Sequence, residues 1–248
     1  MSTKMISALC ITYGRSHLLE EAIEAFLKQD YQNKELIIVN DLPEQKLIFD
    51  HPQVKVFNFD QRFSTIGAKR NKSVELSSGE ILTSWDDDDL YLPWLLSTIV
   101  NEFEKQPNLG FIQPNKTWCL NGLNVEKSKG WCAHTAFTRE SFNEVGGYKL
   151  INSGQDMDLV NRLKKHLSPA GRAKELNLTY NEACYVFRWN TGAYHLSGYG
   201  RDKEGKESGF SKIEKAIKSQ KIEPQKILNP HWNHDYMGMI NSFLASSK

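Results

Sequence analysis

Apolar residues in the first part of the chain gather in short runs that alternate with longer stretches of helical spacing. Short apolar runs predict buried strands, and apolar residues three or four positions apart predict helices. Strands that alternate with helices favour an α/β fold, in which helices flank a mostly parallel central sheet. In chain order, the pattern predicts strands over residues 5–12, 35–39, 54–59 and 80–85, and helices over residues 18–29 and 66–76.

The pattern beyond residue 90 is less regular, with no internal repeat and no clear linker. Residues 198–221 are rich in glycine, lysine, glutamate and serine, which predicts a loop running into an amphipathic helix. The remaining pattern predicts helices over residues 95–104, 139–145, 156–166 and 235–244, and strands over residues 111–113, 132–137 and 184–189.

Four consecutive aspartates, Asp86 to Asp89, follow the predicted strand over residues 80–85. Neighbouring carboxylates repel one another by roughly 1 kcal/mol or more per close pair at a partly buried site, so a compensating cation is the natural explanation. Mg²⁺ and Mn²⁺ prefer hard oxygen ligands, keep several waters and share their other positions with phosphates. The alternative is a solvated acidic turn that caps a helix beginning near Pro93.

Asp41 likewise comes shortly after a predicted strand, over residues 35–39. In open parallel sheets, ligands bind beyond the carboxyl ends of the strands. Asp41 and the aspartate run are therefore expected to converge on one crevice at that edge of the sheet.

The composition narrows the classes of partner. Of the 248 residues 40% are apolar, and 31 basic against 30 acidic residues give a net charge of +1, which argues against a whole-protein attraction to nucleic acid or membrane. No apolar stretch approaches the roughly 18 residues of a transmembrane helix, and no signal-like core follows the first residues. Four widely spaced cysteines without a CxxC pair favour reduced thiols, so a cytoplasmic protein is expected.

Six short segments together resemble the signatures of a known enzyme family. They are ITYGR at 11–15, KELIIVND at 34–41, GAKRN at 67–71, WDDDDLYLP at 85–93, VGGY at 145–148 and SGQDMDL at 153–159. In this order and spacing they resemble the family 2 glycosyltransferases of the GT-A fold, the Asp-x-Asp type. The resemblance implies a nucleotide-diphospho-sugar transferase fold.

The resemblance implies a role for each segment in binding the donor. Asp41 would accept a hydrogen bond from a pyrimidine N–H, and Thr12 and Tyr13 would border the base. Lys69 and Arg70, near a helix N-terminus, would receive phosphate. The alternatives are a turn aspartate, a buried strand-end tyrosine and a surface-exposed pair of cations.

The same resemblance implies different roles for the aspartates of the run. Asp88 is the expected ligand of Mn²⁺ or Mg²⁺, Asp86 or Asp87 would face the ribose or the metal's water shell, and Asp89 would approach the donor sugar. Four aspartates in a row leave this register open by one residue. His195, on a late loop, is expected to be a further metal or phosphate ligand, the alternative being a structural histidine.

Asp156 occupies the position of the family's catalytic base. A direct displacement at the anomeric carbon needs a carboxylate within reach of the acceptor hydroxyl, and the result is inversion. Gln155 replaces the glutamate that usually precedes this aspartate, which removes one negative charge. The alternative is that Asp156 only caps a helix, a role that Ser153 could also fill. Trp131 and His134 lie where family members approach the sugar and acceptor, the alternative being a buried Trp131.

These expectations define the domain and its function. Residues 1–200 would form the GT-A domain, with a nucleotide-binding half over 1–110 and an acceptor-side half over 111–200, while 201–248 would add a lid or an acceptor-binding extension. The expected activity is metal-dependent, inverting transfer from a nucleotide sugar, with UDP-sugar favoured, to a hydroxyl of a glycan, lipid-linked or other acceptor. The alternatives are a sugar nucleotidyltransferase, which would want a glycine-rich first loop, and a non-catalytic nucleotide-sugar-binding protein. A nucleic-acid partner is not expected.

Overall fold

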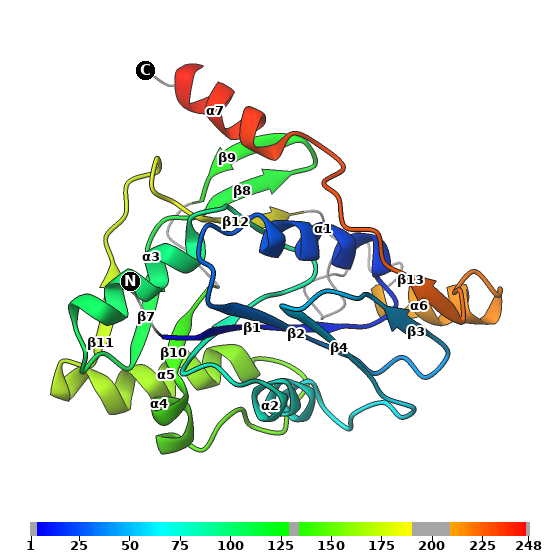
Figure 1. The fold of residues 1–248 in the computed structure, drawn as a ribbon, viewed down its shortest axis with the longest axis horizontal. Helices are drawn as coiled ribbons and strands as arrows, with labels where there is room; N and C mark the ends of the chain where they lie inside the picture. Colours follow the sequence, from blue (N-terminus) through cyan, green and yellow to red (C-terminus); the bar gives the residue numbers. More distant parts are fainter. Residues whose placement is uncertain (1–3, 129–133, 190–208, 247–248) are drawn as a thin grey trace.

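The computed structural model describes residues 4–128, 134–189 and 209–246, and it centres on a seven-stranded sheet (Figure 1). The strand order is β11-β7-β10-β5-β1-β2-β4. Strand β1 pairs in parallel with β2 and β5, and β10 runs antiparallel to its two neighbours. The bounds are β1 Ile6–Thr12, β2 Lys34–Asn40, β4 Val54–Asn58, β5 Ile81–Ser84, β7 Phe111–Pro114, β10 Ala136–Thr138 and β11 Ala173–Leu176. The predicted α/β fold with a mostly parallel sheet is confirmed.

Helices cover both faces of this sheet (Figure 1). Helices α1 (Ser16–Leu27) and α3 (Leu95–Lys105) pack one face against apolar side chains that include Ala8 and Ile38. The other face is covered by α2 (Ile66–Leu76), α4 (Arg139–Glu144) and α5 (Gln155–Leu167). All seven residues of β2 are buried, as expected for a strand that is covered on both sides.

Two smaller sheets flank the central one. The first has the order β6-β12-β8-β9, and the second pairs β13 with β3. Their bounds are β6 Leu90–Tyr91, β12 Tyr185–Trp189, β8 Trp118–Asn121, β9 Asn124–Lys127, β13 Gln225–Ile227 and β3 Lys46–Ile48, and the late helices are α6 (Gly209–Lys218) and α7 (Tyr236–Ser246). The sequence pattern missed the strands of these two sheets, apart from β12, and it also missed β11. None of the helices in the described ranges combines the length and apolarity needed to cross a bilayer.

A buried ion pair joins β12 to α1, and the same glutamate also binds the C-terminal segment. The guanidinium of Arg188 lies 2.5 Å from a carboxylate oxygen of Glu21, and both side chains are almost completely buried. The other oxygen of Glu21 accepts hydrogen bonds from the Tyr236 hydroxyl at 2.6 Å and the Asn233 amide at 3.0 Å. Burial alone would raise the pKa of Glu21, but Arg188 and these donors lower it below its usual value.

We expect Glu21→Gln to lower the free energy of unfolding by about 3–5 kcal/mol, because it leaves the buried charge of Arg188 without its partner. Urea denaturation measures this loss. The matched control is Glu24→Gln in the same helix, whose pair with Lys28 at 2.9 Å is partly exposed and is expected to contribute less than about 1 kcal/mol. Equal losses in the two variants would contradict the assignment.

Candidate active site

A cavity of about 610 Å³ lies at the carboxyl ends of β1, β2 and β5, where the strand pattern predicted a crevice. The described residues that were expected to bind donor or metal or to act as the base all line it. These are Thr12, Tyr13, Asp41, Lys69, Arg70, Asp86, Asp87, Asp88, Asp89 and Asp156. His195 and Trp131 lie outside the described residues, so His195 as a metal ligand stays a prediction.

One end of the cavity is built around Asp41. One of its carboxylate oxygens accepts a hydrogen bond from the Phe63 amide at 3.0 Å, and the other pairs with the ammonium of Lys69. Lys69 also donates to the Thr12 carbonyl at 2.6 Å. Burial lowers the pKa of Lys69, while the Asp41 carboxylate opposes that shift. Lys69 therefore fixes Asp41 in place, and phosphate binding by Lys69 stays a prediction.

Tyr13 forms the neighbouring wall of the cavity. Its ring is half-buried, and the guanidinium carbon of Arg62 lies 5.0 Å from the ring centroid, which is the distance of a cation–π contact. Gly14, next in sequence, has φ of +66°, so the backbone turns sharply between β1 and α1. Tyr13 thus lines the cavity just before this turn, and its role in bordering a base stays a prediction.

The three aspartates that begin the run have different partners. Asp86 is the most exposed of them and accepts from a guanidinium nitrogen of Arg70 at 2.8 Å. Asp87 accepts from the Thr12 hydroxyl at 2.7 Å and pairs with Arg15 through its other oxygen. Asp88 accepts from the second terminal nitrogen of Arg15 at 2.8 Å. Arg15 thus bridges two neighbouring carboxylates, a contact that the sequence analysis did not anticipate.

Asp89 differs from the other three aspartates. Its carboxylate is buried and accepts hydrogen bonds from the Tyr185 hydroxyl at 2.5 Å and the Arg188 amide at 2.9 Å, both on β12. Burial, together with the charges of Asp88 and Asp86, raises the pKa of Asp89 to about 8. The Asp89 side chain thus joins the aspartate loop to β12. Asp89 also lines the cavity, so its approach to the donor sugar stays a prediction.

The cavity-facing carboxylates fit a divalent cation. The carboxylates of Asp86, Asp87 and Asp88 face two guanidinium groups, those of Arg15 and Arg70, so negative charge remains. Burial also raises the pKa of Asp87 to about 6. Within the described ranges, no three His, Cys, Asp or Glu side chains already form a metal-binding group. Mg²⁺ and Mn²⁺ do not need such a cage, because one or two carboxylates, waters and substrate phosphates complete their coordination.

Asp156 lines the cavity from the first turn of α5. Gly154, with φ of +72°, occupies the N-cap position, so neither Asp156 nor Ser153 caps this helix. The Asp156 side chain is exposed, and one oxygen accepts from the Met157 amide at 2.8 Å. Its charge contributes to raising the pKa of Arg70, the partner of Asp86, so Asp156 lies near the aspartate run.

Two of the sequence motifs hold the start of α5 over α2. A β-carbon at Gly67 would lie 1.8 Å from the Lys149 carbonyl oxygen, so only glycine permits this approach. The Asn71 side chain donates to the Tyr148 carbonyl and accepts from the Tyr148 amide, both at 2.9 Å. These contacts explain on physical grounds why the GAKRN and VGGY segments occur together with the segment that carries Asp156.

His134 does not line the cavity. It is buried between the rings of Tyr91 and Tyr185, and its Nε2 lies 3.1 Å from the Thr83 hydroxyl. The expectation that His134 approaches the sugar or the acceptor is therefore wrong, because the side chain points into the core. Burial lowers its pKa to about 3.

This burial of His134 predicts a pH dependence of stability. The folded pKa lies below the unfolded value of about 6.5, so the unfolded state binds more protons between the two values and stability falls as pH falls through that window. The slope approaches about 1.4 kcal/mol per pH unit. Urea denaturation between about pH 6 and pH 4 should show a shallower loss for His134→Gln than for wild type. The control His166→Gln, on the surface, should keep the wild-type slope; parallel curves for wild type and His134→Gln would refute the prediction.

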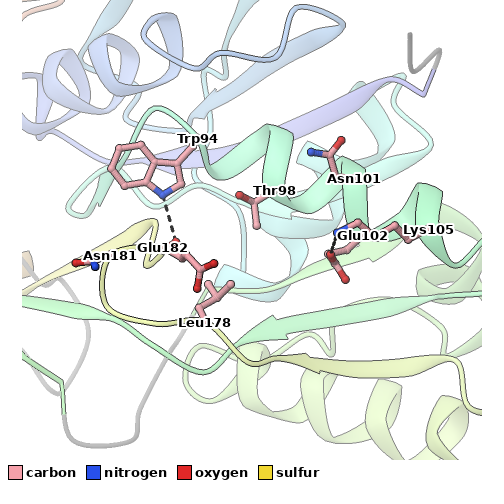
Figure 2. Close-up of a pocket in the computed structure, with 8 residues that line it drawn as sticks. All are labelled: Trp94, Thr98, Asn101, Glu102, Lys105, Leu178, Asn181 and Glu182. Carbon is pink, nitrogen blue, oxygen red and sulfur yellow. Dashed lines mark hydrogen bonds and ion pairs between the residues drawn. The ribbon is translucent and has the colours of Figure 1, made fainter.

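A second hollow, of about 390 Å³, lies against α3 and does not contain any predicted site residue. Figure 2 shows Trp94 and Glu102 at this hollow with their polar groups engaged: the indole nitrogen donates to the Glu182 carbonyl at 3.2 Å, and Glu102 pairs with Lys105 at 2.7 Å. The cavity at the aspartate run is therefore the candidate active site.

The family model described as glycosyl transferase family 2 matches residues 7–154, which include the strand-end aspartates and most of the cavity wall. The chain belongs to glycosyl transferase family 2. This family 2 chain also has curated relatives. It is 31% identical over 122 residues to the putative colanic acid biosynthesis glycosyl transferase WcaA of Escherichia coli K12. The matched stretch covers 46% of this chain and 43% of the relative.

A second relative matches more of the chain. The glucosyl-dolichyl phosphate glucuronosyltransferase of Haloferax volcanii is 26% identical over 185 residues, which covers 62% of this chain and 58% of that protein. The family 2 chain thus spans less than two thirds of the length of either of these two relatives.

Solved structures resemble the fold of this family 2 chain. Staphylococcus aureus TarS 1–349 in complex with UDP-GlcNAc gives a TM-score of 0.61 at 16% identity, covering 81% of this chain and 63% of that one. The mannosyltransferase PcManGT of Pyrobaculum calidifontis, in complex with GDP-Man and Mn²⁺, gives 0.57 at 16% identity, covering 79% and 60%. At these identities the likeness establishes the fold, which is GT-A.

Proposed function

We propose that this chain is a metal-dependent, inverting glycosyltransferase that moves a sugar from a nucleotide-sugar donor, preferably a UDP-sugar, to an acceptor hydroxyl. One observation carries the proposal: a single cavity holds Asp41 beside Tyr13, the carboxylates of Asp86 to Asp88, and Asp156 on the facing helix start. These are the groups that a base, a diphosphate and a sugar with its acceptor would need within one cavity. Family membership and the GT-A fold support the same assignment.

The nucleoside end of the donor would bind at Asp41. The carboxylate is held by Lys69 and the Phe63 amide, which keeps it in one position for an N–H of the base. Tyr13, with its half-buried ring, would stack on the base or border it. UDP is the preferred nucleotide because a pyrimidine N–H suits a single carboxylate acceptor, and one structural neighbour was solved with UDP-GlcNAc.

The diphosphate would lie at the aspartate run. Asp88 is the proposed ligand of Mn²⁺ or Mg²⁺, with Asp86 or Asp87 reaching the ribose or the metal's water shell. A bound divalent ion supplies Lewis-acid stabilisation of the departing diphosphate. Arg70, itself near the N-terminus of α2, contributes positive charge beside Asp86 and is proposed to contact phosphate.

Asp156 is the proposed general base. It would take the proton of the acceptor hydroxyl as that oxygen attacks the anomeric carbon from the side opposite the diphosphate. One C–O bond then forms, the bond between the anomeric carbon and the phosphate oxygen breaks, and the nucleoside diphosphate leaves with the bonding electrons. Attack from the opposite side inverts the anomeric carbon.

A panel of nucleotide sugars, tested for protection against thermal unfolding with and without Mn²⁺, would test the proposal. A ligand at 100 times its dissociation constant stabilises the folded state by about 2.7 kcal/mol. We expect UDP-sugars to protect, and only with the metal. Protection without turnover of donor, by transfer or by hydrolysis, would support the alternative of a binding protein. Absence of protection by any nucleotide sugar would contradict both functions.

A further inference from the structure

The guanidinium of Arg15 lies against the carboxylates of the aspartate run, where a metal cation is also expected. Its side chain is 11% exposed, and its two terminal nitrogens pair with Asp87 and, at 2.8 Å, with Asp88. Burial alone would lower the pKa of Arg15, but the charges of these two carboxylates raise it above its usual value. The planar fork of arginine suits this double contact, which a lysine ammonium would not reproduce.

These contacts occupy the atoms that a metal ion would use. Asp88, the proposed metal ligand, already gives one carboxylate oxygen to Arg15. Both oxygens of Asp87 are engaged as well, one by Arg15 and one by the Thr12 hydroxyl. A divalent ion at Asp88 and a guanidinium on the same carboxylate repel each other, so the two cations compete for it.

We propose that Arg15 is an exchangeable counter-cation, which holds Asp88 in the donor-free enzyme and moves to the donor diphosphate when the metal binds. This inference rests on the proposed function. Arg15 keeps its contact with Asp87, and the nitrogen that leaves Asp88 donates to a diphosphate oxygen. Guanidinium groups form strong charge-assisted hydrogen bonds with phosphate, so the diphosphate compensates for the contact that was lost.

The exchange has a thermodynamic consequence. Metal binding without nucleotide displaces one nitrogen of Arg15 from Asp88 and leaves Asp87 to balance the guanidinium charge, so the metal alone binds weakly. A diphosphate supplies that anion, so metal and nucleotide each strengthen the binding of the other. Because this coupling is reciprocal, it can be measured from either ligand.

Among the described residues, the other arginines that line the cavity do not share this arrangement. Arg70 pairs with Asp86 at the more exposed beginning of the run. Arg62 also lines the cavity, but its guanidinium lies over the Tyr13 ring. Arg62→Gln therefore removes the same charge from the same cavity without removing a contact to Asp87 or Asp88, which makes it the matched control for Arg15→Gln.

Titration calorimetry would measure the dissociation constant of Mn²⁺ with and without UDP for wild type and both variants. For Arg15→Gln we expect Mn²⁺ alone to bind about tenfold tighter, and the strengthening of Mn²⁺ binding by UDP to fall about tenfold. Arg62→Gln should stay within about threefold of wild type in both quantities. Arg15→Lys, which keeps the charge and loses the fork, should fall between wild type and Arg15→Gln, and its folding can be checked by circular dichroism.

The outcomes separate the two proposals. Wild-type protein that binds Mn²⁺ and UDP together, with Arg15→Gln unchanged in both quantities, would overturn the exchange and leave the proposed function standing. The same would follow if Arg62→Gln changed as much as Arg15→Gln, because the effect would then be a general loss of positive charge. Wild-type protein that binds neither ligand would overturn both proposals.

Discussion

Asp156→Asn is expected to lower the rate of sugar transfer about a thousandfold while leaving the affinity for UDP within about twofold. A positioned general base contributes typically 10²–10⁴-fold, and asparagine keeps the shape of the side chain without its basicity. Asp156 lines the cavity from α5 and is exposed, so the substitution buries no new group. Turnover measured with saturating donor, together with calorimetry for UDP, separates the two effects.

Asp158→Asn is the control in the same helical turn. Asp158 pairs with Lys149 at 2.6 Å and with Arg162, and it is not among the residues that line the cavity. Its substitution is expected to cost some stability and to change turnover by no more than about threefold. If Asp156→Asn kept transfer within tenfold of wild type, Asp156 would not be the base.

Asp88→Asn is expected to weaken Mn²⁺ binding in the presence of UDP at least about a hundredfold. Even residues that only orient metal ligands cost 10–100-fold in affinity, and Asp88 is proposed as a ligand itself. Asparagine also loses the negative charge that faces Arg15. The dependence of UDP affinity on Mn²⁺, measured by calorimetry, should therefore disappear.

Asp89→Asn, at the adjacent residue, is the control variant for Asp88→Asn. Its carboxylate is directed to Tyr185 and the Arg188 amide. We expect this variant to lose stability and, in its folded form, to keep Mn²⁺ affinity within about threefold. If UDP affinity in Asp88→Asn still rose with Mn²⁺ as in wild type, the metal ligand would lie elsewhere.

Helices were predicted well where local signals are strong. Helix α2 occupies the predicted residues, because Thr65 caps its start by accepting from the Ala68 amide and a serine-glycine segment ends it. The short strands of the flanking sheets were missed for the opposite reason. Strand β13 pairs with β3 in a register that places Gln225 opposite Lys46, and no periodicity within a few residues predicts a pairing over such a distance in the sequence.

The sequence predicted which residues line the cavity better than it predicted which side chains contact one another. Strand ends share one edge of a parallel sheet, so the convergence of Asp41 with the aspartate run followed from topology. The partners of the side chains did not follow. Tyr185 on β12 meets Asp89 from 96 positions away in the sequence, and Arg15 meets Asp87 from 72 positions away. His134 was misplaced because its burial comes from the rings of Tyr91 and Tyr185, which lie far from it in the sequence.

The contacts between the C-terminal segment and α1 predict how a shortened chain would behave. Adjacent glutamates of α1 receive that segment, Glu20 through the Asn229 amide and Glu21 through Tyr236. The ion partner of Glu21 is Arg188, whose own amide fixes Asp89. An expression fragment that stops before Tyr236 would therefore remove one of the hydrogen bonds to the buried Glu21 carboxylate. Because Arg188 connects Glu21 to Asp89, we expect such a fragment to lose turnover through a loosened aspartate run, even if the removed residues touch no substrate.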